Sequence, residues 1–163
     1  MNILMRSNLS FRNLLHYEVY DNTGVIKYLI VPRIISLDYE YRVKNAKDEE
    51  VNKFVFPMFF GYPGYLKEKD VIKAKLNFKP WERFTFICPE LGLEIKSFIF
   101  LHDYIVKKDG KVIATIHKKW LSIFDSYEIT YQENGNEIDE LTYAFLIVGT
   151  NFILKQITKI VGR

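Results

Sequence analysis

The sequence LTYAFLIVGTNFIL, residues 141–154, decides the fold of this chain. It is apolar on nearly every face of the helix that it predicts, and a helix of that kind has to be enclosed by the rest of the protein. Asp139 precedes it as an N-cap, and Lys155 and Lys159 follow where the helix dipole favours cations. We therefore predict a buried, central helix over residues 141–160.

A membrane span is the alternative for this stretch. Its apolar core is about 14 residues long, whereas a span needs roughly 20 residues. Small or polar residues also interrupt the apolar run, namely Thr142, Gly149, Thr150 and Asn151. Both the length and the interruptions favour a core helix over a helix that crosses a bilayer.

The residues before this helix read as consecutive antiparallel strands. Short runs rich in Val, Ile, Tyr, Phe and Thr alternate with turn signals. Aromatic residues make up 16% of the chain, which favours pleated, half-buried surfaces. No linker or change of composition divides the sequence, so we expect residues 1–163 to form one domain. Its fold class is mainly β, or α+β with the helix included.

The clearest hairpin spans residues 104–119. Asp109 and Gly110 supply the two positive-φ positions that a tight primed turn needs. After the turn, alternation predicts one apolar face, made by Val112, Ala114 and Ile116. Ile113 breaks the otherwise polar set that we expect on the opposite face. Further turn signals lie at residues 22–24, 45–50, 89–92 and 134–135.

Composition limits the setting and the partners. Cys88 is the only cysteine, so no internal disulfide can form. The first ten residues lack the apolar run and the small-residue cleavage site of a signal peptide, so we expect a reducing, cytoplasmic setting. The net charge of +3, from 23 basic and 20 acidic residues, is small beside the basic excess of nucleic-acid binders. We therefore do not expect nucleic acid as a partner.

Residues 98–154 follow a recognisable order: a tight turn, an alternating strand, a basic-aromatic corner, an acidic segment and an apolar helix. The residues that carry this order are Asp103, Tyr104, Asp109, Gly110, Lys111, Ala114, Ile116, Lys118, Lys119, Trp120, Ser122, Asp125 and Tyr127. The order resembles the tubby C-terminal-like superfamily, specifically the LURP-one-related proteins. This resemblance implies a closed barrel of about twelve antiparallel strands around a central hydrophobic C-terminal helix.

The same resemblance implies a class of ligand. Relatives in the superfamily include tubby domains, which bind membrane phosphoinositides, and phospholipid scramblases, whose activity is tied to lipid and calcium. Anionic membrane lipid is therefore a candidate ligand for this chain. The phosphoinositide-binding residues of tubby domains do not match positions here one by one, so none is carried over.

Lys118, Lys119 and Trp120 form the most suggestive local cluster. Two ammonium groups beside an amphipathic ring suit an anionic headgroup at a membrane surface. The simpler interpretation is a solvated lysine at a strand edge, with the ring filling the end of the core. Lys107 and Lys108 flank the tight turn and would extend the same basic surface across the hairpin.

No group of residues specifies a reaction. His16, His102 and His117 lie far apart, without the spacing of a metal site and without a paired nucleophile. Cys88 reads as a small buried side chain rather than a nucleophile. No acidic run has the spacing of a calcium loop, and the glycines form no phosphate-binding loop. We therefore expect no catalytic residue, no metal and no cofactor.

Two functional hypotheses remain from different classes. The first is a non-catalytic binding module for anionic phospholipid or phosphoinositide, cytoplasmic and peripheral at the membrane. The second is a structural or protein-interaction scaffold without a small ligand. In the second case the barrel exterior would dock onto a protein partner, with a patch of exposed aromatics around Phe59, Phe60 and Tyr62 in the aromatic segment 58–65.

Overall fold

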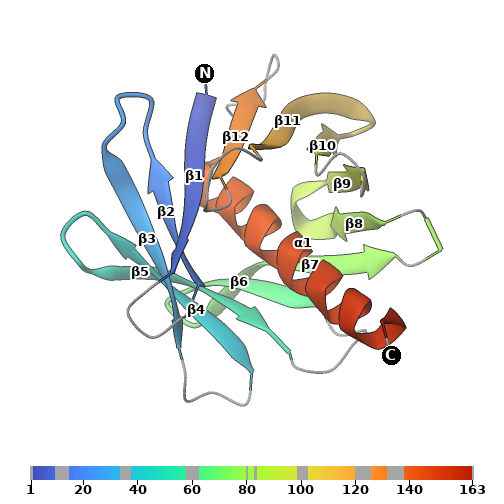
Figure 1. The fold of residues 1–163 in the computed structure, drawn as a ribbon, viewed down its shortest axis with the longest axis horizontal. Coiled ribbons are helices and arrows are strands. Elements are labelled where there is room, and N and C mark those ends of the chain that lie inside the picture. The colour runs from blue at the N-terminus through green and yellow to red at the C-terminus, as the bar shows by residue number, and fades with distance from the viewer. Residues whose placement is uncertain are drawn as a thin grey trace.

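A closed barrel of twelve antiparallel strands surrounds one long helix in the computed structural model of this chain (Figure 1). The structure describes residues 2–9, 15–33, 38–57, 63–79, 81–82, 84–98, 103–119, 126–131 and 138–162, and all counts refer to them. The strands are β1 (Asn2–Leu9), β2 (Leu15–Tyr20), β3 (Ile26–Arg33), β4 (Tyr39–Asn45), β5 (Glu50–Phe56), β6 (Gly64–Glu68), β7 (Val71–Lys79), β8 (Thr85–Cys88), β9 (Leu93–Phe98), β10 (Asp103–Lys108), β11 (Lys111–Lys119) and β12 (Ser126–Tyr131). A 3₁₀ turn, η1 (Pro89–Leu91), joins β8 to β9, and the helix is α1 (Glu140–Val161). The predicted fold class is confirmed.

Each strand pairs with the strands before and after it in the sequence, and β1 pairs with β12 to close the barrel. The closing register runs from Asn2 opposite Thr130 to Arg6 opposite Ser126. Closure leaves the described sheet without an edge strand that could pair with another chain. Because neighbouring strands are antiparallel, successive connections lie at alternate ends of the barrel.

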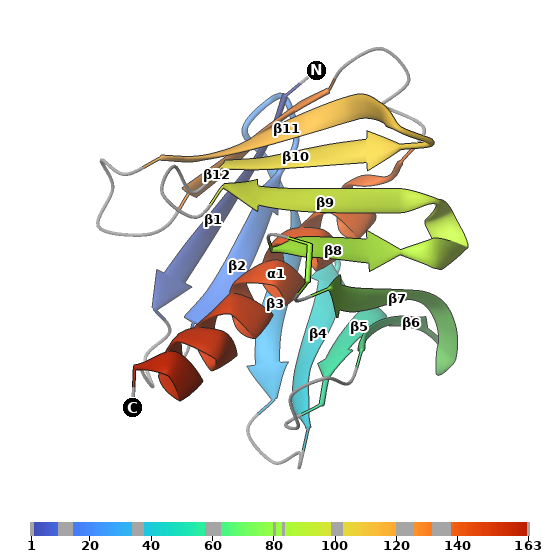
Figure 2. The same cartoon turned by 90° about the vertical axis from the view of Figure 1, so that its right-hand side faces the viewer.

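Helix α1 runs through the barrel and leaves it at one end (Figure 2). Asp139 caps the helix as predicted, because its Oδ1 accepts the backbone N–H of Thr142 at 2.7 Å. Residues 142–150 are all buried, whereas residues 151–157 are mostly half-buried. The helix is therefore a core element over its first half and emerges over its second. In the part of the chain that the structure describes, no helix is long and apolar enough to cross a membrane.

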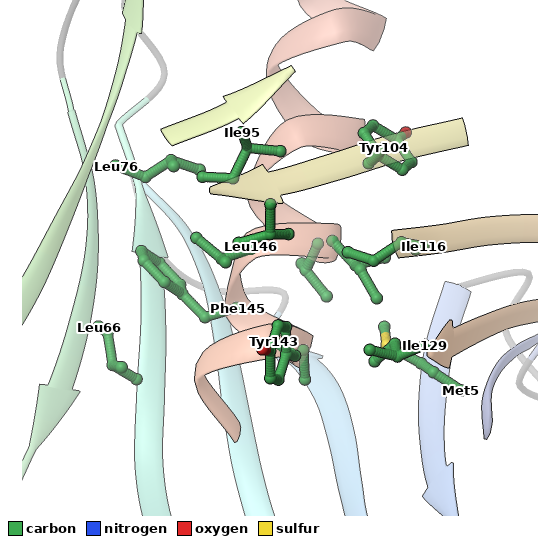
Figure 3. Packing of buried hydrophobic residues seen from close by; sticks show 14 of the residues in the cluster. Met5, Leu66, Leu76, Ile95, Tyr104, Ile116, Ile129, Tyr143, Phe145 and Leu146 are labelled. Carbon is green, nitrogen blue, oxygen red and sulfur yellow. The ribbon is translucent and has the colours of Figure 1, made fainter. Parts of the chain in front are cut away.

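The buried half of α1 packs against aromatic side chains of β5. The rings of Phe56 and Phe145 are stacked, with centroids 5.9 Å apart and an interplanar angle of 11°. The ring of Phe54 also lies 5.4 Å from that of Phe145. Figure 3 shows Tyr143, Phe145 and Leu146 among side chains from several strands of the wall. This packing confirms the expected core helix.

Part of the aromatic segment at residues 58–65 is described. Gly64 begins β6, and a Cβ at this position would lie 2.6 Å from the ring of Phe56. The backbone of β6 can therefore approach that ring closely only because residue 64 has no side chain. Residues 58–62 lie outside the described residues, as does the turn predicted at residues 134–135.

Two predicted hairpin turns are confirmed by their backbone geometry. Asp109 and Gly110 have φ angles of 49° and 78°, as a primed turn between β10 and β11 requires. Gly24, in the turn between β2 and β3, has a φ of 84°. In both turns the sequence signal lies where the chain adopts the left-handed conformation.

The predicted alternation after the β10–β11 turn is wrong at two positions. Val112, expected inside, is 41% exposed, and Ile113, expected outside, is 4% exposed. The register gives the reason. Val106 pairs with Ala114, but its neighbour Lys107 pairs with Val112, which leaves Ile113 as an extra residue in β11. This β-bulge offsets the alternation and turns Ile113 into the core.

Candidate functional site

The two ends of the barrel carry different groups of connections. The end where α1 begins, here called the turn end, carries the turns at residues 21–25, 46–49, 69–70, 89–92 and 109–110. The opposite end, here called the helix-exit end, is where α1 leaves the barrel (Figure 2). Its described members include Arg33, Asp38, Tyr39, Lys79, Trp81, Glu82, Asp103, Lys118, Lys119, Ser126 and α1 from Asn151 onward. The rings of Tyr39 and Phe152 have centroids 4.7 Å apart, so the start of β4 lies at the same end as the emerging half of α1.

The turn end consists of short turns that satisfy their own polar groups. In the β2–β3 turn, Asp21 Oδ1 accepts the backbone N–H groups of Thr23 and Val25, at 2.8 and 3.0 Å, and the Thr23 hydroxyl at 2.6 Å. These hydrogen bonds lower the pKa of Asp21. In the β4–β5 turn, Asn45 Oδ1 accepts the backbone N–H groups of Lys47 and Glu49 in the same way. Such turns are stable without a ligand.

Among the described residues of the helix-exit end, two aromatic rings are exposed. Trp81, in the connection that follows β7, is 90% exposed, and Tyr39 is 42% exposed. An indole ring has a large apolar surface and one N–H donor, and it usually lies partly buried in a folded domain. Trp81 is therefore available to a partner that offers both apolar and polar contacts.

Cations at the strand ends of the helix-exit end are paired with carboxylates. Arg33 Nη1 lies 3.4 Å from Glu40 Oε1, and Lys79 Nζ lies 3.3 Å from Glu82 Oε1. All four side chains are at least partly exposed, so these pairs contribute little to stability. Their effect on the surface is to offset positive charge locally.

The emerging end of α1 has a different charge balance. Residues 151–163 contain Lys155, Lys159 and Arg163 and no acidic residue. Because the chain has 23 basic and 20 acidic residues, residues 1–150 carry 20 of each sign. The whole net charge of +3 therefore lies in the last thirteen residues of the sequence, and two of their cations, Lys155 and Lys159, lie on α1. The side chains of Lys155 and Lys159 are exposed.

Two of the lysines predicted to bind lipid lie at the helix-exit end. Lys119 Nζ is 3.0 Å from Glu128 Oε2 on β12. Lys118 Nζ lies 5.9 Å from the ring centroid of Tyr127, within range of a cation–π interaction. Trp120, the third member of the predicted cluster, lies outside the described residues.

Lys107 and Lys108 lie beside the β10–β11 turn, at the turn end. The intervening strand β11, nine residues from Lys111 to Lys119, spans about 26 Å at roughly 3.3 Å per residue. The two lysine pairs therefore do not form one basic surface along the hairpin, contrary to our expectation. Antiparallel pairing puts the turn and the open ends of a hairpin at opposite ends of the barrel.

A hydrogen-bonded network lies where α1 leaves the barrel. The Tyr104 hydroxyl donates to Asn151 Oδ1 at 2.7 Å, and Asn151 Nδ2 donates to the Tyr127 hydroxyl at 2.7 Å. Tyr104 and Tyr127 are 3% and 1% exposed, so their hydroxyl groups need such partners. The network ties α1 to β10 and β12. Its member on β12, Tyr127, is also the residue whose ring Lys118 faces.

The histidines and the cysteine have ordinary structural surroundings where they are described. His117 Nδ1 lies 2.6 Å from Asp103 Oδ1, and His16 Nε2 lies 3.8 Å from Glu18 Oε1. His102 lies outside the described residues. Burial raises the pKa of the Cys88 thiol from 9.0 to about 11. A thiol with that pKa is protonated at neutral pH and is a weak nucleophile.

The described residues do not form a metal site, and no related protein points to another type of site. Among the described residues, no three His, Cys, Asp or Glu side chains come close enough together to hold a metal ion. Comparisons with protein-family models, curated proteins and solved structures found no match to this chain. The surface of this molecule is therefore the basis for a functional proposal.

The sequence-based candidates did not include Trp81, Lys155 and Lys159. A signal for the two lysines was present, because the last thirteen residues hold all of the net charge. The grouping with Trp81 depends on the topology, which places the connection after β7 and the end of α1 at the same end of the barrel.

Proposed function

We propose that this domain is a non-catalytic module that binds the surface of membranes containing anionic phospholipid. One observation carries the proposal: two cations of the charge excess, Lys155 and Lys159, lie on the part of α1 that emerges at the same end as the exposed Trp81. Anionic headgroups attract clustered basic residues, and tryptophan prefers the membrane–water interface. On this proposal the protein is cytoplasmic and peripheral at the membrane.

We also propose kinship with the tubby C-terminal-like superfamily, in the LURP-one-related group. The twelve-strand closed barrel with one C-terminal helix is the architecture that this resemblance implies, and it supports the proposal. Fold alone does not assign function, so the lipid has to be tested directly. Phosphoinositide is the first anionic lipid to compare with phosphatidylserine.

Sedimentation with vesicles tests the proposal. Purified protein is mixed with vesicles of phosphatidylcholine alone, or of phosphatidylcholine with phosphatidylserine or a phosphoinositide, at low and moderate salt. We expect binding to the anionic vesicles only, and weaker binding at higher salt because counterions screen exposed charges. Equal, negligible sedimentation with all three vesicles would overturn the proposal and favour the protein-interaction scaffold, for which an exposed Trp81 is also suitable.

A further inference from the structure

We propose that the barrel docks on the membrane end-on, with the helix-exit end toward the lipid. Lys155 and Lys159 supply the charge contact, and Trp81 supplies the interfacial anchor. This inference rests on the proposed function and adds the orientation and the contact residues. The partner is the surface of an anionic bilayer, not a protein.

The charge distribution selects this end. Lys155 and Lys159 lie on a helix segment without acidic residues. The strand-end cations Arg33 and Lys79 face carboxylates within 3.4 Å, and residues 1–150 together carry equal numbers of basic and acidic residues. The helix dipole favours a cation in the last turn, which accounts for Lys159. Lys155 lies one turn earlier on the same emerging segment, and its side chain is exposed.

The position of Trp81 agrees with the same orientation. Its ring is 90% exposed, more than any other large hydrophobic side chain of the described residues. The neighbouring Glu82 would repel an anionic surface if it stood alone. Its carboxylate lies 3.3 Å from Lys79 Nζ, so that repulsion is offset beside the ring. Trp81 can therefore enter the headgroup region without carrying an uncompensated anion with it.

The exposed aliphatic residues of the turn end do not form a competing surface. They lie in three places: Val25 and Ile26 by the β2–β3 turn, Val71 and Ile72 by the β6–β7 turn, and Val112 by the β10–β11 turn. Each place lies four strand-to-strand spacings from the next around the barrel, a path of about 19 Å at roughly 4.8 Å per spacing. Small separate patches of this kind are normal on a protein surface.

A matched pair of double variants tests the orientation. Lys155→Gln with Lys159→Gln removes two charges at the helix-exit end, and Lys107→Gln with Lys108→Gln removes two at the turn end. Each basic residue near an anionic surface is worth about fivefold in binding, or about 1 kcal/mol. We expect the helix-exit variant to lose roughly 25-fold in its partition onto phosphatidylserine-containing vesicles, and the turn variant to lose less than about twofold. Glutamine is nearly as good a helix former as lysine, so both variants should keep the wild-type melting temperature.

The outcomes separate this inference from the proposed function. If the wild-type protein does not bind the anionic vesicles, both fail. If it binds and the two variants lose binding equally, or the turn variant loses more, the end-on orientation is overturned while the membrane function stands. Loss confined to the helix-exit variant supports the orientation.

Fluorescence tests the anchor separately. The chain has two tryptophans, so Trp120→Phe leaves Trp81 as the sole indole. We expect its emission to move to shorter wavelength on addition of phosphatidylserine-containing vesicles, and to be quenched by a quencher attached to the lipid. Unchanged emission from protein that sediments with the vesicles would overturn the role of Trp81.

Discussion

Gly149 of α1 faces Leu76 of β7 so closely that a Cβ on residue 149 would lie 2.5 Å from Leu76 Cδ2. The same Cβ would lie 3.0 Å from Cε1 of Phe56. Leu76 and Phe56 are 0% and 1% exposed, so neither side chain can move into solvent to make room. The helix therefore meets the barrel wall at a residue without a side chain.

Gly149→Ala should lower stability although alanine is the better helix former. Alanine gains about 1 kcal/mol of helix propensity, while overpacking a core costs about 1 to 3 kcal/mol. We expect a net loss of about 1 kcal/mol in the free energy of unfolding, measured by urea denaturation. Gln156→Ala, at a half-buried position of the same helix, is the control. An increase in stability for Gly149→Ala would show that Leu76 and Phe56 can move to accommodate the added methyl group.

Phe145→Ala should cost more than Phe152→Ala. Phe145 is fully buried and stacks on Phe56. Its loss leaves a cavity in the core and should lower the free energy of unfolding by about 3 to 5 kcal/mol. Phe152 is half-buried where α1 emerges, and about half that cost is expected. Thermal melting of both variants measures the difference. Retention of the wild-type melting temperature in both would contradict a helix at the centre of the barrel.

Ile113→Thr should destabilise the protein more than Val112→Thr, whereas simple alternation along β11 would predict the opposite. Val112 is 41% exposed, so its replacement should change stability by less than about 0.5 kcal/mol. Ile113 is 4% exposed, and a threonine there buries a hydroxyl and loses apolar contact, at a cost of about 1 to 3 kcal/mol. Urea denaturation compares the two. A larger loss for Val112→Thr would mean that β11 has no bulge.

Stability should fall at alkaline pH. Burial raises the pKa of Tyr41 from 10.0 to about 12 and that of Cys88 from 9.0 to about 11, and it also raises the pKa of Tyr131 and Tyr143. The unfolded chain therefore loses these protons at lower pH than the folded chain. The stabilisation is fully present below pH 9.0 and is lost as the pH rises through 11 and 12.

The free energy of unfolding as a function of pH checks this expectation. Each group contributes a slope of at most about 1.4 kcal/mol per pH unit while only the unfolded form is ionised. Above pH 10.0, Tyr41→Phe should remove the contribution of one ionising group from the slope of the free energy of unfolding against pH. A free energy that stays constant up to pH 11 would contradict the raised pKa of Cys88.

The architecture could be predicted because its main signals are local. The apolar stretch at residues 141–154 is hydrophobic around the whole helix, and only enclosure satisfies such a surface. The Asp109–Gly110 turn requires left-handed backbone angles that few other residue pairs adopt readily. The number of strands was inferred from the family resemblance, and the structure agrees with it.

The bulge and the candidate surface could not be predicted in the same way. Whether Ile113 points inward depends on its pairing with β10, and alternation along one strand carries no information about its partner. Lys107 and Lys118 look alike in sequence, yet they lie at opposite ends of the barrel because each strand reverses the direction of the chain. The partition of charged residues between two ends is a property of topology.

The closing pair of strands has a consequence for how the molecule is made. Asn2 must find Thr130 before the barrel is complete, and α1 follows all twelve strands in the chain. During synthesis, the strands are therefore made before the helix that covers their inner faces. Such non-local pairing is slow and leaves apolar strands open to aggregation in the meantime. We expect the yield of native protein to depend on how soon the helix reaches the unfinished wall.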